Sequence, residues 1–393
     1  MAITQTPGRL SGIDAARGIA LFGMMCTHVF PLYVEGTSDA SWIGATFSGR
    51  SSALFALVAG IGLALLSGGS RMHDRAGISR DRRGIAARAV VIAMVGLMLG
   101  GLETNIAVIL FHYGILFLMA LPFIGMPLRR LCWWAAGWTL ISPVAAFLLR
   151  PWVGTNINPS DLDGNPALEH FAQPATLLAD ILVTGYYPAL QWLSYLLLGI
   201  LIGRLNLRSF GVQAGLLVAG VGLAGLSKFV SAFLLGPLGG LAVLLETPQG
   251  RRYDIEAMLP VSLTGIDQTG TWWWLAVSAP HSGTPLDLMH TAGTAAAVVG
   301  LCLMATRRLQ WLLLPLSAPG AITLSLYSLH IWIMSIVDQQ EIPLDPAPVY
   351  WAQAAVFIAI GLLLRKLGAR GPLEYVAAGA SDVARSAGAV SRR

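Results

Sequence analysis

The sequence contains few charged residues and very little cysteine. Only 11% of its 393 residues are Asp, Glu, Lys or Arg, whereas about a quarter are charged in a typical soluble domain. Because 55% of the residues are hydrophobic, the chain has too little polar surface to cover a water-soluble fold. The cysteines, Cys26, Cys132 and Cys302, lie far apart in separate apolar runs. The sequence therefore supports neither a disulfide network nor a cysteine metal site.

The sequence also lacks a continuous basic patch, a repeat of fixed period and a low-complexity linker. The formal net charge is +5, but short clusters of Lys and Arg alternate with apolar runs. That distribution is typical of membrane topology signals and not of a nucleic-acid surface, so no nucleic-acid partner is expected. Residues 1–370 are predicted to form a single transmembrane domain, and residues 371–393 a short cytoplasmic tail.

Long apolar runs dominate the rest of the sequence. A helix needs about 20 apolar residues to cross a hydrocarbon core of about 30 Å. Runs of this kind are found at 12–33, 48–67, 85–103, 106–125, 131–149, 186–204, 209–230, 289–306, 319–337 and 349–365. These runs predict an all-α, polytopic transmembrane helical bundle of about ten spans with both termini cytoplasmic. A further apolar stretch at 229–245 is broken by Gly236, Pro237, Gly239 and Gly240, so a re-entrant segment is predicted there instead of an eleventh span.

The positions of Lys and Arg predict which side each loop faces. Cytoplasmic loops are enriched in basic residues. If the N terminus is cytoplasmic, few Lys and Arg residues fall on the outer side, namely Arg50, Arg150, Lys228, Arg251 and Arg252. Asp and Glu divide the other way, so the outer surface is expected to be acidic and to favour a neutral or cationic acceptor over a strongly anionic one. The predicted location is the cytoplasmic (inner) membrane, with the lipid bilayer as a partner.

The first predicted helix carries the densest set of ionisable residues. Asp14, Arg17 and His28 lie within RLSGIDAARGIALFGMMCTHVF, and such groups are costly in a membrane unless they pair or line a wet cavity. Arg17 and His28 share almost the same helix face, about 16 Å apart along the axis. This spacing suits a donor that binds its phosphates at Arg17 and extends a long arm toward His28, as acyl-coenzyme A would. The alternative is that Asp14 and Arg17 only pair with each other and that His28 bonds a neighbouring helix.

Three further histidines are predicted to lie near the outer ends of their helices. His112, His290 and His330 each lie within a few residues of the outer end of an apolar run, at about the depth of His28. Together with His28 they are candidates for one outward cavity, with His112 in a catalytic role and His290 and His330 contacting the substrate. The alternative is that each imidazole is a structural residue bonded across helices. Their spacing matches no metal-binding pair, so no metal is expected.

Four segments of the chain resemble one family of membrane enzymes. RLSGIDAARGIALFGMM resembles the first helix of the heparan-α-glucosaminide N-acetyltransferase and YeiB-type membrane acyltransferases. GYYPALQWLSYLLLGILIGR, from Gly185 to Arg204, looks like the Tyr-Pro-x-x-x-Trp helix of that family. GAITLSLYSLH resembles its penultimate helix, and RGPLEYV resembles its closing signature. The segments occur in the family's order and cover nearly the whole chain, which identifies residues 1–370 as an acyltransferase-like domain.

The resemblance implies transfer of an acyl group, with acetyl as the first expectation, from cytoplasmic acyl-coenzyme A to a sugar or cell-envelope glycan outside. In the related acyltransferase-3 proteins an Arg and a His have the spacing of Arg17 and His28. In the lysosomal heparan enzyme the active histidine lies in the loop after the first helix, and the corresponding stretch here, 31–47, contains none. This departure assigns the catalytic role to His28, as a general base or a transient acyl carrier.

Residues on the outer side are predicted to assist His28. Glu103, at the outer end of the third apolar run, is the candidate to orient the His28 ring, and a simple surface acid is the alternative. Tyr186, Tyr187 and Trp192 are candidates for a platform on which a sugar stacks. Aromatic residues at this depth also commonly anchor helices at the membrane interface.

On the cytoplasmic side, Arg82 and Arg83 are predicted to join Arg17 and Asp14 in binding the donor. The alternative is that this basic run only sets topology. The expected partners are acyl-coenzyme A, a glycan acceptor and the bilayer, and a homo-oligomer is compatible with the sequence.

Two other functional classes stay open from the sequence. A transporter or exporter of a glycan or lipid-linked metabolite would also contain buried charges and helices broken by glycine, although the two halves of the chain show no inverted repeat. A structural membrane protein whose histidines sense pH would leave the position of Arg17 unexplained. Consumption of a coenzyme A thioester distinguishes an enzyme from both alternatives.

Overall fold

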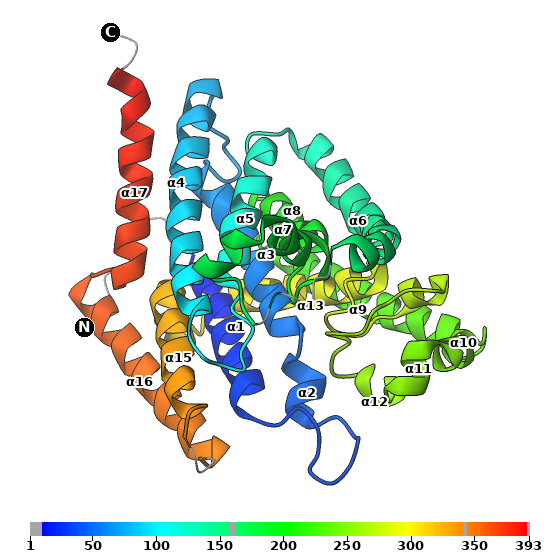
Figure 1. The fold of residues 1–393 in the computed structure, drawn as a ribbon. Coiled ribbons are helices and arrows are strands. Elements are labelled where there is room, and N and C mark those ends of the chain that lie inside the picture. Colours follow the sequence, from blue (N-terminus) through cyan, green and yellow to red (C-terminus); the bar gives the residue numbers. More distant parts are fainter. Residues whose placement is uncertain (1–9, 158–161, 163, 341–343, 391–393) are drawn as a thin grey trace.

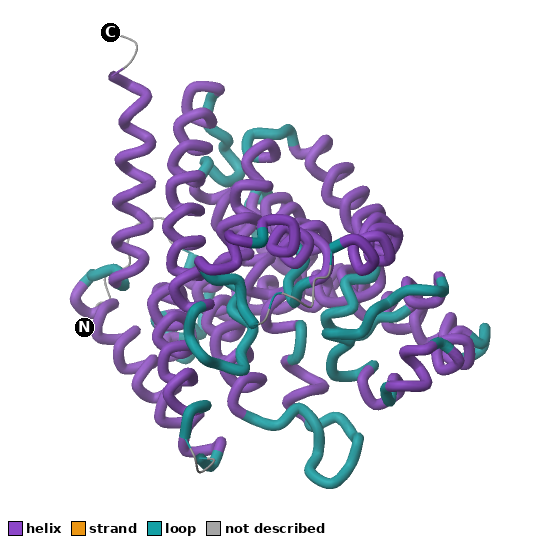
Figure 2. The backbone as a smooth tube through the Cα atoms, in the orientation of Figure 1, coloured by secondary structure: helices purple, strands orange, loops and turns teal. Residues whose placement is uncertain are grey.

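The computed structural model describes residues 10–157, 162, 164–340 and 344–390. Within these residues all regular secondary structure is helical, and the chain contains no β-strand beyond an isolated bridge between Tyr33 and Ala40. Figure 1 and Figure 2 show the helices packed around one another, with the loops after α1 and after α4 at the end of the molecule opposite to α17. The predicted all-α fold is confirmed.

Each of the predicted apolar runs contains a helix. These helices are α1 (Ser11–Val29), α3 (Arg50–Leu66), α4 (Arg75–Gly100), α5 (Leu110–Ala120), α6 (Leu128–Asn156), α8 (Ala189–Gly203), α9 (Phe210–Leu235), α13 (Pro285–Ala305), α15 (Thr323–Val337) and α16 (Pro346–Leu367). Shorter segments connect them: α2 (Trp42–Phe47), η1 (Leu121–Phe123), η3 (Leu168–Ala172), α7 (Pro174–Ala179), η4 (Asp180–Thr184), α10 (Gly240–Glu246), α11 (Pro248–Arg252), α12 (Ile255–Met258), η5 (Trp272–Ala276), α14 (Leu314–Ser317) and η6 (Pro319–Ile322). A last helix, α17 (Pro372–Val390), follows α16.

Several of these helices are suited to cross a membrane. In the described part of the chain, 7 helices are long and apolar enough, or 8 if α7–η4 and α8, which are bent by 51° relative to each other, form one span. α1 does not meet this test, and α5 is shorter, with 11 residues. The protein is thus a multi-pass membrane protein, whereas the count of ten spans and the cytoplasmic position of both termini stay predictions.

Large apolar side chains cover the outside of the bundle. Trp133 on α6, Val218 and Phe229 on α9, and Trp351 on α16 are each between 65% and 73% exposed. Contiguous apolar surface of this extent is unfavourable in water. Lipid chains solvate such side chains, while the backbone polar groups are satisfied inside each helix. These faces therefore contact the hydrocarbon.

Small residues allow α1 to lie in close contact with its neighbours. A side chain at Gly18 would meet the backbone of Leu316, and a side chain at Gly320 would meet the backbone of Asp14. α1 also packs against α3 and α13. Glycine permits this backbone-to-backbone approach between membrane helices. As a result, Arg17 and His28 are held by one element whose position is fixed on several sides.

The apolar stretch at 229–245 is divided between two helices. α9 ends at Leu235, and α10 begins at Gly240 after Gly239, which has a φ of 78°. With 7 residues, α10 is too short to cross a bilayer. The described structure therefore places no eleventh span in this stretch.

The segment after Arg370 forms α17, which lies beside the N-terminal half of α4 (Figure 1). Arg385 on α17 pairs with Asp81 on α4, at 3.4 Å between Nη2 and Oδ1. Near the start of α17, Glu374 Oε1 accepts the backbone N–H of Leu324 at 2.7 Å. The region predicted as a tail is thus a helix that contacts the bundle near both of its ends.

Candidate functional site

A cavity of about 790 Å³ lies beside the N-terminal half of α1. Its walls come from α1, α3, α4, α5 and the segments from α14 to α17. Phe55, Ala59, Leu110, Tyr113 and Phe117 form an apolar part of the wall. The volume falls within the range of small-molecule sites, which combine apolar walls with a few polar groups.

Arginine side chains line the rest of this cavity. They are Arg17, Arg88, Arg365, Arg370 and Arg385, and they outnumber the carboxylates Asp14, Glu374 and Asp382. Arg17 Nη1 donates to Asp14 Oδ1 at 3.1 Å, while Glu374 accepts bonds from the start of α15. Guanidinium groups stay charged and match the geometry of phosphate oxygens. The cavity therefore fits a ligand that carries phosphates and an uncharged arm.

The structure separates the four residues that were predicted to bind the donor on the cytoplasmic side. Asp14 and Arg17 line the cavity, but Arg82 and Arg83 do not. Arg82 Nη2 donates to the carbonyl oxygens of Pro122 at 3.1 Å and Ile124 at 2.9 Å, so it fastens α4 to the turn after α5. Arg83 is exposed.

At the other end of α1, His28 belongs to a chain of hydrogen-bonded side chains. His28 Nδ1 lies 3.0 Å from His330 Nε2, and His330 Nδ1 lies 2.9 Å from Gln353 Oε1. The two imidazole rings are nearly parallel, 12° apart, with centroids separated by 5.3 Å. His330 is fully buried and His28 is half-buried. α15 and α16 thus position His28 through His330 and Gln353.

This chain of bonds determines which ring nitrogens carry protons. Gln353 Nε2–H donates to the carbonyl oxygen of Val349 at 3.3 Å, so its Oε1 accepts from His330 Nδ1–H. His330 Nε2 then holds a lone pair and accepts from His28 Nδ1–H. In the neutral form of His28, the second nitrogen, Nε2, then holds a lone pair. The arrangement presents a neutral imidazole whose Nε2 can take up a proton.

The other predicted histidines occupy different surroundings. His112 on α5 is buried, its ring lies edge-on to Tyr187 with centroids 5.7 Å apart, and neither ring nitrogen makes a hydrogen bond of normal geometry to a described residue. His290 Nε2 accepts from Arg50 Nε at 3.3 Å. Of the predicted set of four, the structure therefore brings only His28 and His330 into direct contact.

Tyr187 and Trp192 belong to an aromatic cluster at the start of α8. Both are buried, and their rings meet edge-on with centroids 4.9 Å apart. The more accessible members are Tyr186, which is 37% exposed, and His281, which stacks on Trp192 at 6.3 Å. His281 has a φ of 58°, a conformation that is uncommon for residues other than glycine. Any contact with a ligand on this cluster would first involve Tyr186 and His281.

Glu103 lies apart from the histidines. It is exposed in the loop after α4, and the partner that orients the His28 ring is His330. Among the described residues, no group of three or more His, Cys, Asp or Glu side chains is placed to hold a metal ion.

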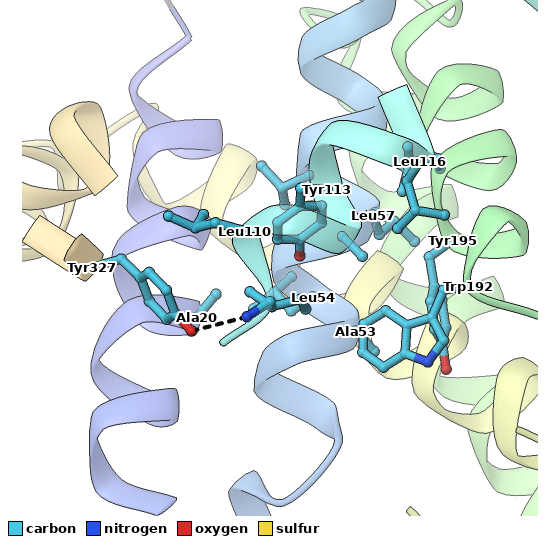
Figure 3. Close-up of a cluster of buried hydrophobic side chains, with 14 of the residues drawn as sticks. Ala20, Ala53, Leu54, Leu57, Leu110, Tyr113, Leu116, Trp192, Tyr195 and Tyr327 are labelled. Atoms are coloured by element: carbon cyan, nitrogen blue, oxygen red, sulfur yellow. Dashed lines mark hydrogen bonds between the residues drawn. The ribbon is translucent and has the colours of Figure 1, made fainter. Parts of the chain in front are cut away.

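A packed layer lies at the level of Ala20, which is between Arg17 and His28 on α1 (Figure 3). Leu110 and Tyr113 belong both to this cluster and to the cavity wall. Tyr327 Oη accepts from the backbone N–H of Ile109 at 3.3 Å, which holds the start of α5 against α15. The cavity therefore extends to this layer, and His28 is not among its lining residues.

Some residues of these sites were missed from the sequence. Arg88 and Gln353 lie inside predicted spans. Because a polar side chain is costly to bury in a membrane, their positions alone could have marked both as candidate functional residues. His281 lies in the segment PHSGTPLD, residues 280–287, and its positive φ has no signal in that sequence. Arg370 and Arg385 lie at or beyond the end of the predicted domain, and only the packing of α17 brings them to the cavity.

Comparison with known protein families identifies the family to which this chain is similar. Residues 9–225 match the family described as heparan-alpha-glucosaminide N-acetyltransferase, catalytic, whereas a comparison with curated proteins finds no match. The matched region contains Arg17, Arg88 and His28, and His330 and Gln353 lie beyond it. Because the match covers more than half of the chain, it confirms the resemblance seen in the first helix. This chain belongs to the heparan-α-glucosaminide N-acetyltransferase catalytic family, a family of membrane acetyltransferases.

Proposed function

We propose that this protein transfers an acyl group, acetyl in the first instance, from cytoplasmic acyl-coenzyme A to a hydroxyl or amine of a sugar or glycan outside. The observation that carries the proposal is the pairing of two features on α1. An arginine-lined cavity lies beside Arg17, and a hydrogen-bonded imidazole with an unprotonated nitrogen lies at His28.

The cavity supports binding of the donor. Arg17, Arg88 and Arg370 present guanidinium groups to it, and these bind the phosphates of the nucleotide end in a charge-assisted way. The uncharged arm then lies along the apolar wall, past Phe55 and Tyr113, as far as the packed layer at Ala20. The distance from Arg17 to His28 along the helix is about 16 Å, which one extended donor molecule can span, so the proposed reaction requires this layer to open between the cavity and His28.

His28 acts as the general base in the proposed reaction. Its Nε2 removes the proton from the acceptor oxygen or nitrogen as that atom attacks the thioester carbonyl carbon. A carbon–oxygen or carbon–nitrogen bond forms, the carbon–sulfur bond breaks, and the imidazolium returns the proton to the departing thiolate. His330 and Gln353 keep Nδ1 protonated and the ring oriented, so they are positioning residues.

The experiment that tests the proposal follows acetyl-coenzyme A directly. Purified protein in detergent is incubated with radiolabelled acetyl-coenzyme A and an amino sugar, and free coenzyme A and labelled sugar are measured. Wild type should consume the thioester and label the sugar. Ala59→Trp fills the cavity wall on α3 and should abolish both donor binding and turnover.

A matched control keeps this result interpretable. Ala136 lies exposed on α6, outside the cavity, so Ala136→Trp should retain full turnover. The thermal midpoint of each variant reports whether it is folded. Folded wild type that neither binds nor consumes acetyl-coenzyme A would refute the proposal, and a folded, fully active Ala59→Trp would show that the donor does not use this cavity.

A further inference from the structure

The apolar part of the cavity wall contains an isolated hydroxyl group. α3 and α5 contribute side chains such as Phe55, Ala59 and Phe117 to this wall. Among the described lining residues of these two helices, Tyr113 is the only one with a polar side-chain atom. The arginines of the cavity come from other parts of the chain, namely α1, α4, α16, α17 and the turn before α17. The Tyr113 hydroxyl therefore lies where the uncharged arm of the donor is proposed to bind.

This hydroxyl group has no hydrogen-bond partner within the described chain. The Tyr113 side chain is buried, with 2% exposed, and its Oη makes no hydrogen bond to a described residue. Tyr327 and Tyr195, which are drawn with it in Figure 3, do have partners. Tyr327 Oη accepts the backbone N–H of Ile109 at 3.3 Å. Tyr195 Oη lies 2.7 Å from Thr291 Oγ1.

A buried donor without an acceptor is unfavourable, because the group has given up water and gained nothing in return. Such groups are rare in folded proteins, and each one asks for an explanation such as a bound ligand or an ordered water molecule. Tyr113 faces a cavity, so a ligand in that cavity can reach it. The hydroxyl group is thus a candidate contact for whatever occupies the apolar part of the cavity.

The packing of α5 determines where the hydroxyl lies. The ring of Tyr113 contacts Phe55 on α3, with centroids 5.4 Å apart, and Phe117 on the next turn of α5, at 6.3 Å. A side chain at Gly114 would collide with α4, so α5 lies directly against that helix. Figure 3 shows the Tyr113 hydroxyl directed toward the packed layer that contains Leu54. A bound group therefore meets this hydroxyl at the end of the cavity, next to the layer.

The arm of acyl-coenzyme A carries a suitable acceptor. The arm contains secondary amides between its phosphates and its sulfur, and an amide carbonyl oxygen needs a hydrogen-bond donor when it is removed from water. The backbone N–H groups of a helix interior already donate within the helix. In the described α3 and α5 wall, Tyr113 is then the side chain that can donate to such an oxygen.

We propose that Tyr113 Oη–H donates to an amide carbonyl oxygen in the arm of the bound donor. This inference rests on the proposed function and adds a second point of attachment to it. The arginines bind the phosphates at one end, and Tyr113 binds the arm where it meets the packed layer. With two fixed points, the thioester beyond the amide is directed at this layer, on the path to His28. Tyr113 is therefore a residue that binds the donor and takes no part in proton transfer.

The first test compares two probes that differ in the arm. Binding of coenzyme A and of adenosine 3′,5′-bisphosphate, which has no arm, is measured by calorimetry on purified protein in detergent. Tyr113→Phe should raise the Kd of coenzyme A about fivefold, as expected for the loss of one neutral hydrogen bond. The Kd of the bisphosphate should stay at the wild-type value. Arg88→Gln should weaken both probes, because its contact is with the nucleotide end.

Tyr195→Phe is the matched control. It removes a hydroxyl that is buried to a similar extent, at 3% exposure, but that lies outside the cavity. Both Kd values should therefore stay unchanged. The thermal midpoint without ligand gives a second contrast. Tyr195→Phe loses a hydrogen bond and should lower the midpoint, whereas Tyr113→Phe loses none and should not. A midpoint that falls in Tyr113→Phe by as much as in Tyr195→Phe would indicate a structural role and contradict the proposal.

The possible failures are distinguishable. If coenzyme A binds Tyr113→Phe as tightly as wild type, the assignment of Tyr113 is wrong, a water molecule is the partner of its hydroxyl, and the donor cavity itself is unaffected. Equal weakening of both probes would also overturn the assignment, because the contact would not be with the arm. Folded wild type that binds neither probe would refute the proposed donor site and this contact together.

Turnover provides a last check. Tyr113→Phe should raise the KM of acetyl-coenzyme A and leave kcat unchanged, because the contact is present both in the bound donor and in the transition state. The KM of the acceptor should equal that of wild type. A lower kcat with an unchanged donor KM would place Tyr113 at the reacting atoms and contradict its assignment to the arm.

Discussion

The two ends of α1 differ in the charge and the burial of the side chains around them. Beside Arg17 the cavity is lined by several guanidinium groups, which stay charged and bind anions from water. At His28 the polar groups are neutral, partly or fully buried, and bonded to one another through His330 and Gln353. Charge is tolerated where a cavity admits water and is costly where it does not. In the proposed function, donor binding and proton transfer therefore belong to separate ends of the same helix.

The shared helix also fixes the distance between these functions. Gly18 and Gly320 permit direct backbone packing between α1 and the segment before α15. α15 in turn carries His330, the partner of His28. The packing that positions the cavity thus also positions the His28–His330 pair. The two ends of α1 have different proposed roles, but the same helix contacts hold both of them in place.

The sharpest test of this comparison removes the base. His28→Ala should lower the rate of acyl transfer by about 10²–10⁴-fold, the contribution expected of a positioned general base, and should leave the Kd of acetyl-coenzyme A unchanged. The measurement pairs turnover with equilibrium binding of the labelled donor. His170→Ala, a change at a buried histidine of the outer loop whose Nδ1 accepts the backbone N–H of Ala167, serves as the control and should keep full activity. Loss of donor binding in His28→Ala would mean that the two ends are not separate.

The converse test removes one arginine from the cavity beside Arg17 and measures donor binding. Arg88→Gln removes a half-buried guanidinium from the cavity and should raise the Kd of acetyl-coenzyme A about tenfold, because one charge-assisted contact is lost. At saturating donor the rate should equal that of wild type. Arg83→Gln, on the exposed face of the same helix, is the matched control. An unchanged Kd in Arg88→Gln would remove this arginine from the donor site.

A smaller effect is expected from the far end of the imidazole chain. Gln353→Leu removes the acceptor that holds His330 Nδ1–H, so His28 no longer has a single tautomer. The loss of one neutral hydrogen bond, about 1 kcal/mol, should lower kcat severalfold while both KM values stay constant. Gln353→Glu retains an acceptor oxygen and should recover most of the rate. Equal losses in the two variants would indicate a packing defect and not a positioning role.

The sequence predicted the helical architecture well because apolar runs of membrane length are a strong signal. It also selected Arg17 and His28, since ionisable residues in such runs are few. It failed where distant segments meet. The sequence placed His28, His112, His290 and His330 in one candidate cavity, but it gave no sign that His330, and not His112 or His290, is the residue that contacts His28.

The sequence also did not predict which arginines lie together in the folded chain. Arg82 and Arg83 were assigned to the donor because they form a run, yet Arg82 is bonded to the carbonyl oxygens of Pro122 and Ile124. Arg385 comes to the cavity only through α17, which packs along α4 and pairs with Asp81 there. Spacing along one helix is predictable from its periodicity, whereas the choice between neighbouring arginines is made by tertiary packing.

The last prediction concerns His281, which lies away from both ends of α1 and affects stability and not catalysis. Burial lowers the pKa of His281 to about 4, compared with about 6.5 in an unfolded chain. Between these values only the unfolded chain takes up the proton, so this group makes the folded protein less stable as the pH falls from about 6.5 to about 4 and contributes nothing above that window. His281→Asn removes the titration while tolerating the positive φ, so its thermal midpoint should decline less than that of wild type over the same pH range. If the two proteins lose stability in parallel from pH 7 to pH 4, the protonation of His281 is not coupled to folding.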